Sequence, residues 1–161
     1  MRTPVFSRLL SLPLAEGTVE VPVYRCNTLV VGSGAAALNC APGRIAKTLS
    51  FMVGEKPILI VAAGDMRIDN AKYKHYFGVK AKMLSAEDAE TLIGHAVGGV
   101  CPFAVNDGVT VYLDESLRAY ETVYPACGSS NSAIELTPDE LEQYAKPAAW
   151  VDVCKPRPAE A

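Results

Sequence analysis

Three groups of residues in this sequence have types and spacing that could do chemistry. The first is the run 32–37 (GSGAAA), which has the spacing of a dinucleotide-binding loop, with Glu55 about 20 residues further on. However, Pro42-Gly43 would end the following helix after about two turns, which is too short for the crossover of a parallel βαβ unit. We therefore expect a helix of small residues packed on a sheet. Binding of a nucleotide or another small molecule at 32–37 stays open as a third alternative.

The second group is Cys101, with His95 six residues before it. A thiolate beside an imidazolium is an activated nucleophile, but the sequence offers no third group that would orient the imidazole. A small buried cysteine next to Pro102 explains the same residues, and we favour that interpretation. The cysteines are odd in number and have no C-x-x-C spacing, and there are only two histidines, so we expect no metal and no disulfide framework.

The third group consists of polar and glycine-rich segments that are far apart in the chain. Lys47 stands at the start of an apolar strand, where a lysine is costly to bury unpaired and should face a cleft or an anion. Residues 94–103 (GHAVGGVCPF) contain three glycines and a proline, and such a loop can bring backbone N–H groups close to a ligand. Polar residues also end a strand at Asp114 and form a turn over 128–132.

These groups must be positioned by short strands and helices. The apolar runs 48–53 and 58–63 predict an antiparallel hairpin, and further strands are expected over 109–113, 122–125 and 133–136. Helices are expected over 33–40, from a cap at Asp69 to Phe77, from Ser85 to Gly94, and from a cap at Thr137 to about Ala145. The pattern predicts a single α+β domain in which helices flank a mixed, curled, barrel-like sheet of about seven strands.

The two ends of the chain show less pattern. Residues 1–27 have no clear period, and we treat them as an N-terminal extension of unclear structure before a domain over 28–146. Residues 147–161 contain several prolines and are expected to be an extended, partly disordered tail. The longest apolar run near a strand, 58–63, is far short of a membrane span, and no signal sequence is evident, so we expect a soluble cytoplasmic protein.

Charge is distributed unevenly. Residues 1–84 contain eleven Lys and Arg against five Asp and Glu, whereas residues 85–145 contain eleven acidic residues and one basic residue, Arg118. This asymmetry would let a polyanion approach one face of a protein whose net charge is -3. Two solvated faces of opposite sign would give the same counts.

Five blocks occur in an order that resembles the YbaK/EbsC family, which comprises the editing domain of prolyl-tRNA synthetase and its free-standing relatives. The blocks cover about residues 33–145 and read IAKTL (45–49), AGDMRID (63–69), GHAVGGVCPF (94–103), DESL (114–117) and IELTPD (134–139). The resemblance implies that family's fold and a trans-editing hydrolase that deacylates mischarged tRNA, of the alanyl- or cysteinyl-tRNA(Pro) type. It also implies water attack assisted by the terminal ribose hydroxyl, without a cofactor or a protein nucleophile.

The resemblance assigns roles to residues by their match to the family motifs. Lys47 matches a lysine that the family needs for activity, and Gly98-x-x-x-Pro102 matches the loop that lines the aminoacyl pocket, where Gly98 and Gly99 would hold the oxyanion. The remaining residues expected to contact the substrate are Thr48, His95, Val100, Cys101, Pro102, Asp114, Gly128 and Asn131. The residues expected to contact the acceptor end of the RNA are Arg67, Lys72, Lys74, Lys80 and Lys82.

Two points keep alternatives open. Some relatives that act on cysteinyl-tRNA have an acidic residue where this chain has Ala133, so the amino acid that is removed stays undetermined. A non-catalytic module of the same fold, which binds tRNA or a synthetase, would keep the basic face but would not need Lys47. Because Lys47 and the 98–102 loop are both present, we favour the enzyme, with aminoacyl-tRNA as partner, a synthetase as a further candidate partner, and neither DNA nor membrane.

Overall fold

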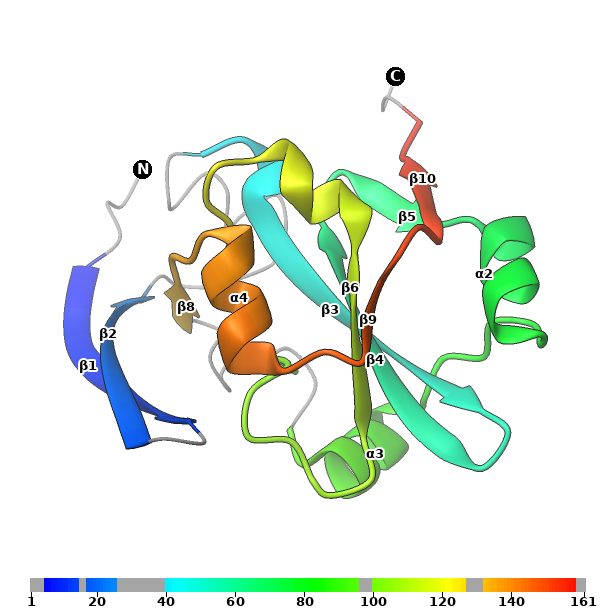
Figure 1. The fold of residues 1–161 in the computed structure, drawn as a ribbon, viewed down its shortest axis with the longest axis horizontal. Helices are drawn as coiled ribbons and strands as arrows, with labels where there is room; N and C mark the ends of the chain where they lie inside the picture. Colours follow the sequence, from blue (N-terminus) through cyan, green and yellow to red (C-terminus); the bar gives the residue numbers. More distant parts are fainter. Residues whose placement is uncertain (1–4, 15–16, 26–39, 96–99, 127–131, 159–161) are drawn as a thin grey trace.

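The centre of the computed structural model is a five-stranded sheet in the order β7-β3-β4-β6-β9 (Figure 1). The structure describes residues 5–14, 17–25, 40–95, 100–126 and 132–158. β3 and β4 form an antiparallel hairpin, and the other neighbouring pairs in this sheet are parallel. The five strands are β3 (Ile45–Val53), β4 (Lys56–Ala63), β6 (Thr110–Asp114), β7 (Tyr124–Pro125) and β9 (Ala149–Val151).

A second sheet lies beside the first and is antiparallel throughout. It contains β1 (Val5–Leu14), β2 (Gly17–Arg25) and β8 (Ser132–Ile134), in that order. Val123 forms a bridge with Leu136, and Ala126 with Ala133, so the β7 and β8 segments join the two sheets into one curled surface. A third, two-stranded ladder pairs β5 (Met66–Ile68) with β10 (Cys154–Pro156).

Three α-helices lie within the described residues, and local sequence signals set their ends. They are α2 (Asn70–Phe77), α3 (Ala86–Asp88), which continues as the π-helical turn η2 (Ala89–Ile93), and α4 (Pro138–Ala145). Asp69 caps α2, and Gly78 ends it with a φ of 77°, a conformation that glycine adopts at little cost. Thr137 and Glu140 form a capping box at the start of α4. None of the helices in the described ranges has the length and apolar character needed to cross a membrane.

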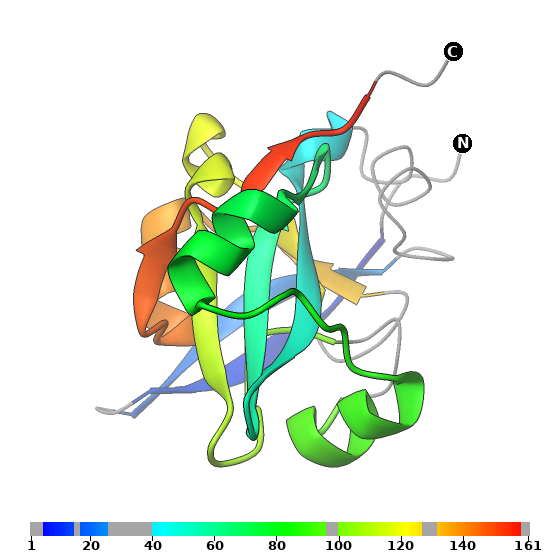
Figure 2. The ribbon, with the colours of Figure 1, turned by 90° about the vertical axis from the view of Figure 1, so that its right-hand side faces the viewer.

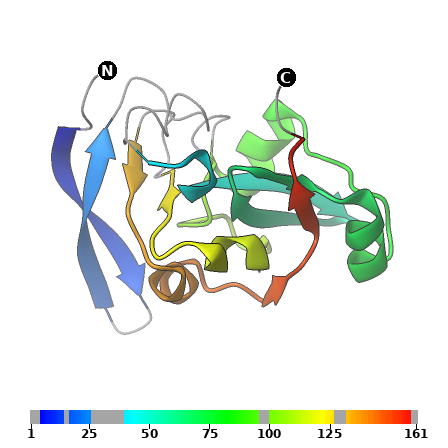
Figure 3. The same cartoon turned by 90° about the horizontal axis from the view of Figure 1, so that it is seen from above.

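The side chains of β4 point alternately to the two faces of the sheet, and this divides the core into two clusters. Leu59 and Val61 belong to the first cluster, which includes Leu117 after β6 and Leu141 of α4. Ile58, Ile60 and Ala62 point to the other face and join the second cluster, to which α2 contributes Tyr73. α4 and α2 therefore pack against different clusters. The turned views show the two helices well apart from each other (Figures 2 and 3).

The α+β class and the mixed, curled sheet are confirmed, as are the hairpin and the caps at Asp69, Ser85 and Thr137. The described residues form ten strands rather than about seven, because both terminal segments add strands. In the N-terminal segment β1 and β2 form a hairpin. Residues 149–156 are extended, as expected, but β9 and β10 pair with the sheets, so the expectation of disorder does not hold there. The expected helix over 33–40 lies almost wholly outside the described residues.

Candidate active site

Lys47 is held between two sheets. It lies on β3, and its ammonium donates a hydrogen bond to the backbone carbonyl of Met66 on β5. Burial is the main reason that the pKa of Lys47 falls from 10.5 to about 8, and the nearby Arg157 guanidinium lowers it further. Cys154 and Asp65 act in the opposite direction but do not compensate. Lys47 is therefore a half-buried cation that is mostly protonated at neutral pH and close to losing its proton.

Asp65 is held beside this lysine where the Tyr120 side chain passes close to the backbone of Gly43. The Tyr120 hydroxyl donates to Asp65 Oδ2 at 2.9 Å, and both groups sit over Gly43. A Cβ at position 43 would come within 1.8 Å of the Tyr120 hydroxyl oxygen, so only glycine leaves room for this contact. Gly64 N also donates to the Gly43 carbonyl at 3.3 Å. The turn before β3 and the turn between β4 and β5 are thereby joined next to Lys47.

Thr48 lies on the opposite face of β3 from Lys47. The register pairs Lys47 with Ala62, which belongs to the second cluster, and Thr48 with Val61, which belongs to the first. The Thr48 hydroxyl oxygen is buried and has no hydrogen-bond partner among the described residues. Lys47 and Thr48 therefore point to opposite faces of β3, as neighbouring residues of a strand do, and the assignment of Thr48 to the substrate stays a prediction.

His95 and Cys101 come together as a packing contact. His95 Nε2 lies 2.7 Å from the Phe103 carbonyl oxygen and 3.6 Å from Cys101 Sγ. Because a carbonyl only accepts, the hydrogen on Nε2 is directed at Phe103, and Nε2 cannot also take a proton from the thiol. Cys101 is 2% exposed and belongs to the first cluster, and Val100 is partly buried against it. The favoured interpretation of Cys101 as a buried residue agrees with this geometry, and the expected contact of Cys101 with a substrate does not.

Pro102 is buried at the edge of a hollow on the face of the sheet that carries the first cluster. The hollow is lined by Pro102, residues 104–109, Val111 and the end of α4, and Lys47 is not among its lining residues. The expected neighbours Gly98, Gly99, Gly128 and Asn131 lie outside the described residues, as does the run 32–37. Their assignments stay predictions.

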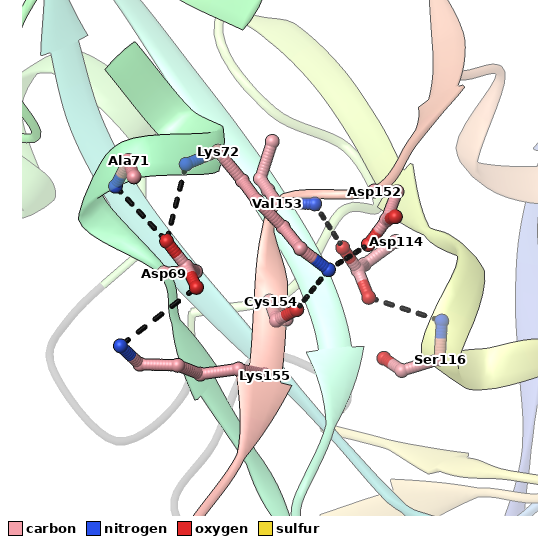
Figure 4. A network of polar contacts seen from close by, with 9 residues as sticks. All are labelled: Asp69, Ala71, Lys72, Asp114, Ser116, Asp152, Val153, Cys154 and Lys155. Carbon is pink, nitrogen blue, oxygen red and sulfur yellow. Dashed lines mark hydrogen bonds and ion pairs between the residues drawn. The ribbon is translucent and has the colours of Figure 1, made fainter. Parts of the chain in front are cut away.

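Asp114 ties three segments together inside the protein (Figure 4). Its Oδ1 accepts from Ser116 N and its Oδ2 from Val153 N, both at 3.0 Å. The carboxylate is 1% exposed and both of its oxygens accept hydrogen bonds from backbone N–H groups, and the assignment of Asp114 to the substrate stays a prediction. Its role is structural: it satisfies buried N–H groups and holds the chain between β9 and β10 against the end of β6.

The basic residues on and around α2 fall into two kinds. Lys72 donates to Asp152 Oδ1 at 2.9 Å and to the Cys154 carbonyl at 3.1 Å (Figure 4), and the bond to Asp152 raises the pKa of Lys72. Asp69 is held in turn by Ala71 N, by Lys72 N and by Lys155 at 3.7 Å; the Lys72 N–H is the largest cause of its lowered pKa. Four exposed basic residues form no salt bridge with any described residue, namely Arg67, Lys74, Lys80 and Lys82.

A separate polar network, which sequence reasoning missed, surrounds Glu135. Its Oε2 accepts from Thr122 Oγ1 at 2.8 Å, from Tyr124 OH at 2.9 Å and from Arg44 Nη2 at 3.0 Å. Burial alone would raise the pKa of Glu135, but these hydrogen bonds and the Arg44 charge outweigh it and lower the pKa. Burial is also the main reason that the pKa of Tyr124 rises to about 12. Arg44 immediately precedes β3, and Thr122 and Tyr124 belong to the β7 segment, so the network braces the end of β3 that carries Lys47.

Comparisons with known proteins agree with this architecture. Residues 28–144 match the model of the aminoacyl-tRNA editing domain family. The uncharacterized protein YwhH of Bacillus subtilis (strain 168) is 48% identical over 137 residues, which cover 84% of this chain and 87% of YwhH. The proline–tRNA ligase of Streptococcus equi subsp. equi (strain 4047) is 25% identical over 138 residues, or 85% of this chain but only 22% of the ligase.

A solved structure shows the same fold. It belongs to a protein described as a proposed trans-editing enzyme for prolyl-tRNA synthetase, with a TM-score of 0.76 and 28% identity over 84% of this chain and 87% of that one. The match of the family model covers both strands of the central hairpin, Lys47 and the segment that leads to α4. This chain belongs to the aminoacyl-tRNA editing domain family.

Proposed function

We propose that this protein hydrolyses the ester bond of mischarged aminoacyl-tRNA and that Lys47 is its central catalytic residue. The observation that carries the proposal is the position of Lys47: a half-buried ammonium on β3, held by the Met66 carbonyl and lacking a salt bridge with any described residue. Lysines are seldom left in such surroundings without a function, because burial disfavours their charged form. An anionic substrate would supply the missing counter-charge.

The reaction requires only water and groups of the protein and the RNA. The water oxygen bonds to the ester carbonyl carbon, the bond from that carbon to the ribose oxygen breaks, and the ribose oxygen takes a proton. Lys47 would stabilise the negative charge that develops on the carbonyl oxygen or on the adjoining phosphate, and the N–H groups of Gly98 and Gly99 would act with it. We infer that the neighbouring ribose hydroxyl helps to position the water.

The basic residues near α2 support contact with the RNA. Arg67 on β5, Lys74 on α2, and Lys80 and Lys82 after α2 are exposed and form no salt bridge among the described residues, so their charges are available to phosphates. Lys72 is held by Asp152 and would contribute less. β5 contacts Lys47 through the Met66 carbonyl and directly precedes α2 in the chain, which would bring the acceptor end of the RNA to the ester-cleaving residue.

The likeness to a proposed trans-editing enzyme for prolyl-tRNA synthetase and to proline–tRNA ligases favours a mischarged tRNA(Pro) as substrate. Alanyl-tRNA(Pro) and cysteinyl-tRNA(Pro) are the two species to test first. Because Ala133 is not acidic, the choice between them is open to experiment.

The deciding experiment is single-turnover deacylation of a panel of aminoacyl-tRNAs, including alanyl-, cysteinyl- and prolyl-tRNA(Pro). The wild type is compared with Lys47→Ala and with Lys56→Gln, a control that removes an exposed charge at the far end of the β3–β4 hairpin. We expect hydrolysis of one mischarged species, a loss of at least about 100-fold in Lys47→Ala, and little change in Lys56→Gln. Salt-sensitive tRNA binding without hydrolysis of any species would establish the non-catalytic module instead.

A further inference from the structure

The C-terminal strand brings a second cation to Lys47. β10 pairs with β5 so that Pro156 lies opposite Met66, the residue whose carbonyl accepts from Lys47. One residue further on, Arg157 N donates to the Asp65 carbonyl at 2.9 Å. Lys47 and Arg157 are thus anchored to adjacent carbonyls of one short segment, although they are 110 positions apart in the sequence.

Asp65 attracts the Lys47 ammonium without forming a salt bridge with it, and the carboxylates of this region have hydrogen-bond partners of their own. Asp65 accepts from the Tyr120 hydroxyl, Asp69 caps α2 and faces Lys155, and the buried Asp114 accepts from two backbone N–H groups. Neither Lys47 nor Arg157 is in a salt bridge with any residue that the structure describes. The Arg157 guanidinium is close enough to disfavour the charged form of Lys47, so the two cations repel each other. An anion between them would remove this repulsion.

We propose that Lys47 and Arg157 together bind one phosphodiester of the RNA substrate, the phosphate nearest to the aminoacyl ester. The inference rests on the proposed function and adds Arg157 as a substrate-binding residue. An arginine suits this role because its planar guanidinium can donate two parallel hydrogen bonds to a phosphate while remaining exposed. Lys47, which is half-buried, would contact the same phosphate from the side of the ester.

The test combines a protein variant with a chemical change in the RNA. The probe is a hairpin of the tRNA(Pro) acceptor stem that carries no amino acid and has a single-stranded 3′ end. Its last phosphodiester is either natural or replaced by an electrically neutral methylphosphonate. Binding is measured for the wild type, Arg157→Gln and Lys56→Gln at one fixed, low salt concentration. Because the probe carries no amino acid, this measurement does not depend on whether the protein hydrolyses an ester.

We expect Arg157→Gln and the methylphosphonate each to weaken binding roughly tenfold. The combination should be little weaker than either change alone, because both remove the same contact. Lys56→Gln should bind the natural hairpin within about twofold of the wild type. Losses that multiply would overturn the inference, because Arg157 would then act on a different part of the RNA, and so would unchanged binding by Arg157→Gln.

The outcomes for this inference and for the proposed function can be told apart. Hydrolysis of a mischarged tRNA by the wild type, together with multiplying losses, leaves the proposed function standing and removes Arg157 from it. Failure of the wild type to bind the natural hairpin would overturn the inference alone, because deacylation of the aminoacyl-tRNA panel tests the proposed function independently.

Discussion

Lys47 on β3 and Met66 on β5 are joined by a hydrogen bond from the lysine ammonium to the methionine carbonyl. The bond fixes the end of a long side chain whose charge is otherwise disfavoured by burial. It also places that charge beside the ladder formed by β5 and β10 rather than beside the His95–Cys101 contact, which belongs to the first cluster. The position of this charge has consequences for activity, pH dependence and stability.

The activity should depend on the protonation of Lys47. Burial and the Arg157 charge lower its pKa to about 8, although Asp65 and Cys154 act in the opposite direction. If the ammonium is the active form, kcat/KM should therefore fall as pH rises above about 8. The rate is measured from pH 6 to 10 and divided by the rate of uncatalysed hydrolysis of the same ester. Lys47→Arg, whose side chain stays charged, should show no fall in this range if it retains activity. A wild-type profile that instead rises through pH 8 would indicate that the neutral amine acts as a general base.

The contribution of Lys47 to the stability of the fold should increase with pH, whereas the activity should decrease. The pKa of Lys47 is about 8 in the folded protein and 10.5 without the fold, so the unfolded chain binds more protons between these values. The contribution of Lys47 to the free energy of unfolding should therefore increase from pH 8 to 10.5. Urea unfolding of the wild type and of Lys47→Met at several pH values isolates this contribution as their difference. A difference that is constant with pH would contradict the lowered pKa.

Thr48→Val should stabilise the protein. The Thr48 hydroxyl is buried without a partner among the described residues, and an unsatisfied buried hydroxyl is unfavourable. Replacing it with a methyl group should raise the free energy of unfolding by about 1 kcal/mol in urea denaturation. Deacylation by the same variant provides a second readout: a tenfold loss of kcat/KM in a stable protein would support the assignment of Thr48 to the substrate-binding residues.

Asp114→Ala should destabilise the protein strongly. The substitution leaves the N–H groups of Ser116 and Val153 without an acceptor in the interior, at a cost of about 2–4 kcal/mol. Asp152→Ala removes an exposed carboxylate next to Val153 in the chain and should cost about 1 kcal/mol or less. Thermal unfolding of both variants tests the contrast. A change in KM of Asp114→Ala with unchanged stability would contradict the structural role.

The lysines near α2 should differ in their effect on RNA binding. Changing Lys74, Lys80 or Lys82 to Gln should each reduce the slope of log Kd against log salt by about one, if that lysine contacts a phosphate. Lys72→Gln should change the slope less, because Asp152 already neutralises Lys72 in the protein. Equal effects of all four substitutions would show that the Lys72–Asp152 pair opens when RNA binds.

The local elements and the family could be predicted from the amino-acid pattern. The hairpin around residues 54–55, the caps at Asp69 and Thr137 and the stop at Gly78 follow from contacts between residues close in the chain, and these are readable as patterns. Motif order was sufficient to connect Lys47 with the editing domains, and residues 28–144 match that family.

The surroundings of Lys47, in contrast, depend on contacts between segments that are far apart in the chain. Asp114 looks like a polar residue at a strand end, yet it is buried because a segment almost 40 positions later supplies its donor, Val153 N. Likewise Arg157, in a proline-rich stretch with no recognisable period, reaches Lys47 because β10 pairs with β5. Pairing between distant strands depends on how the whole core closes, and no local pattern around position 157 encodes it.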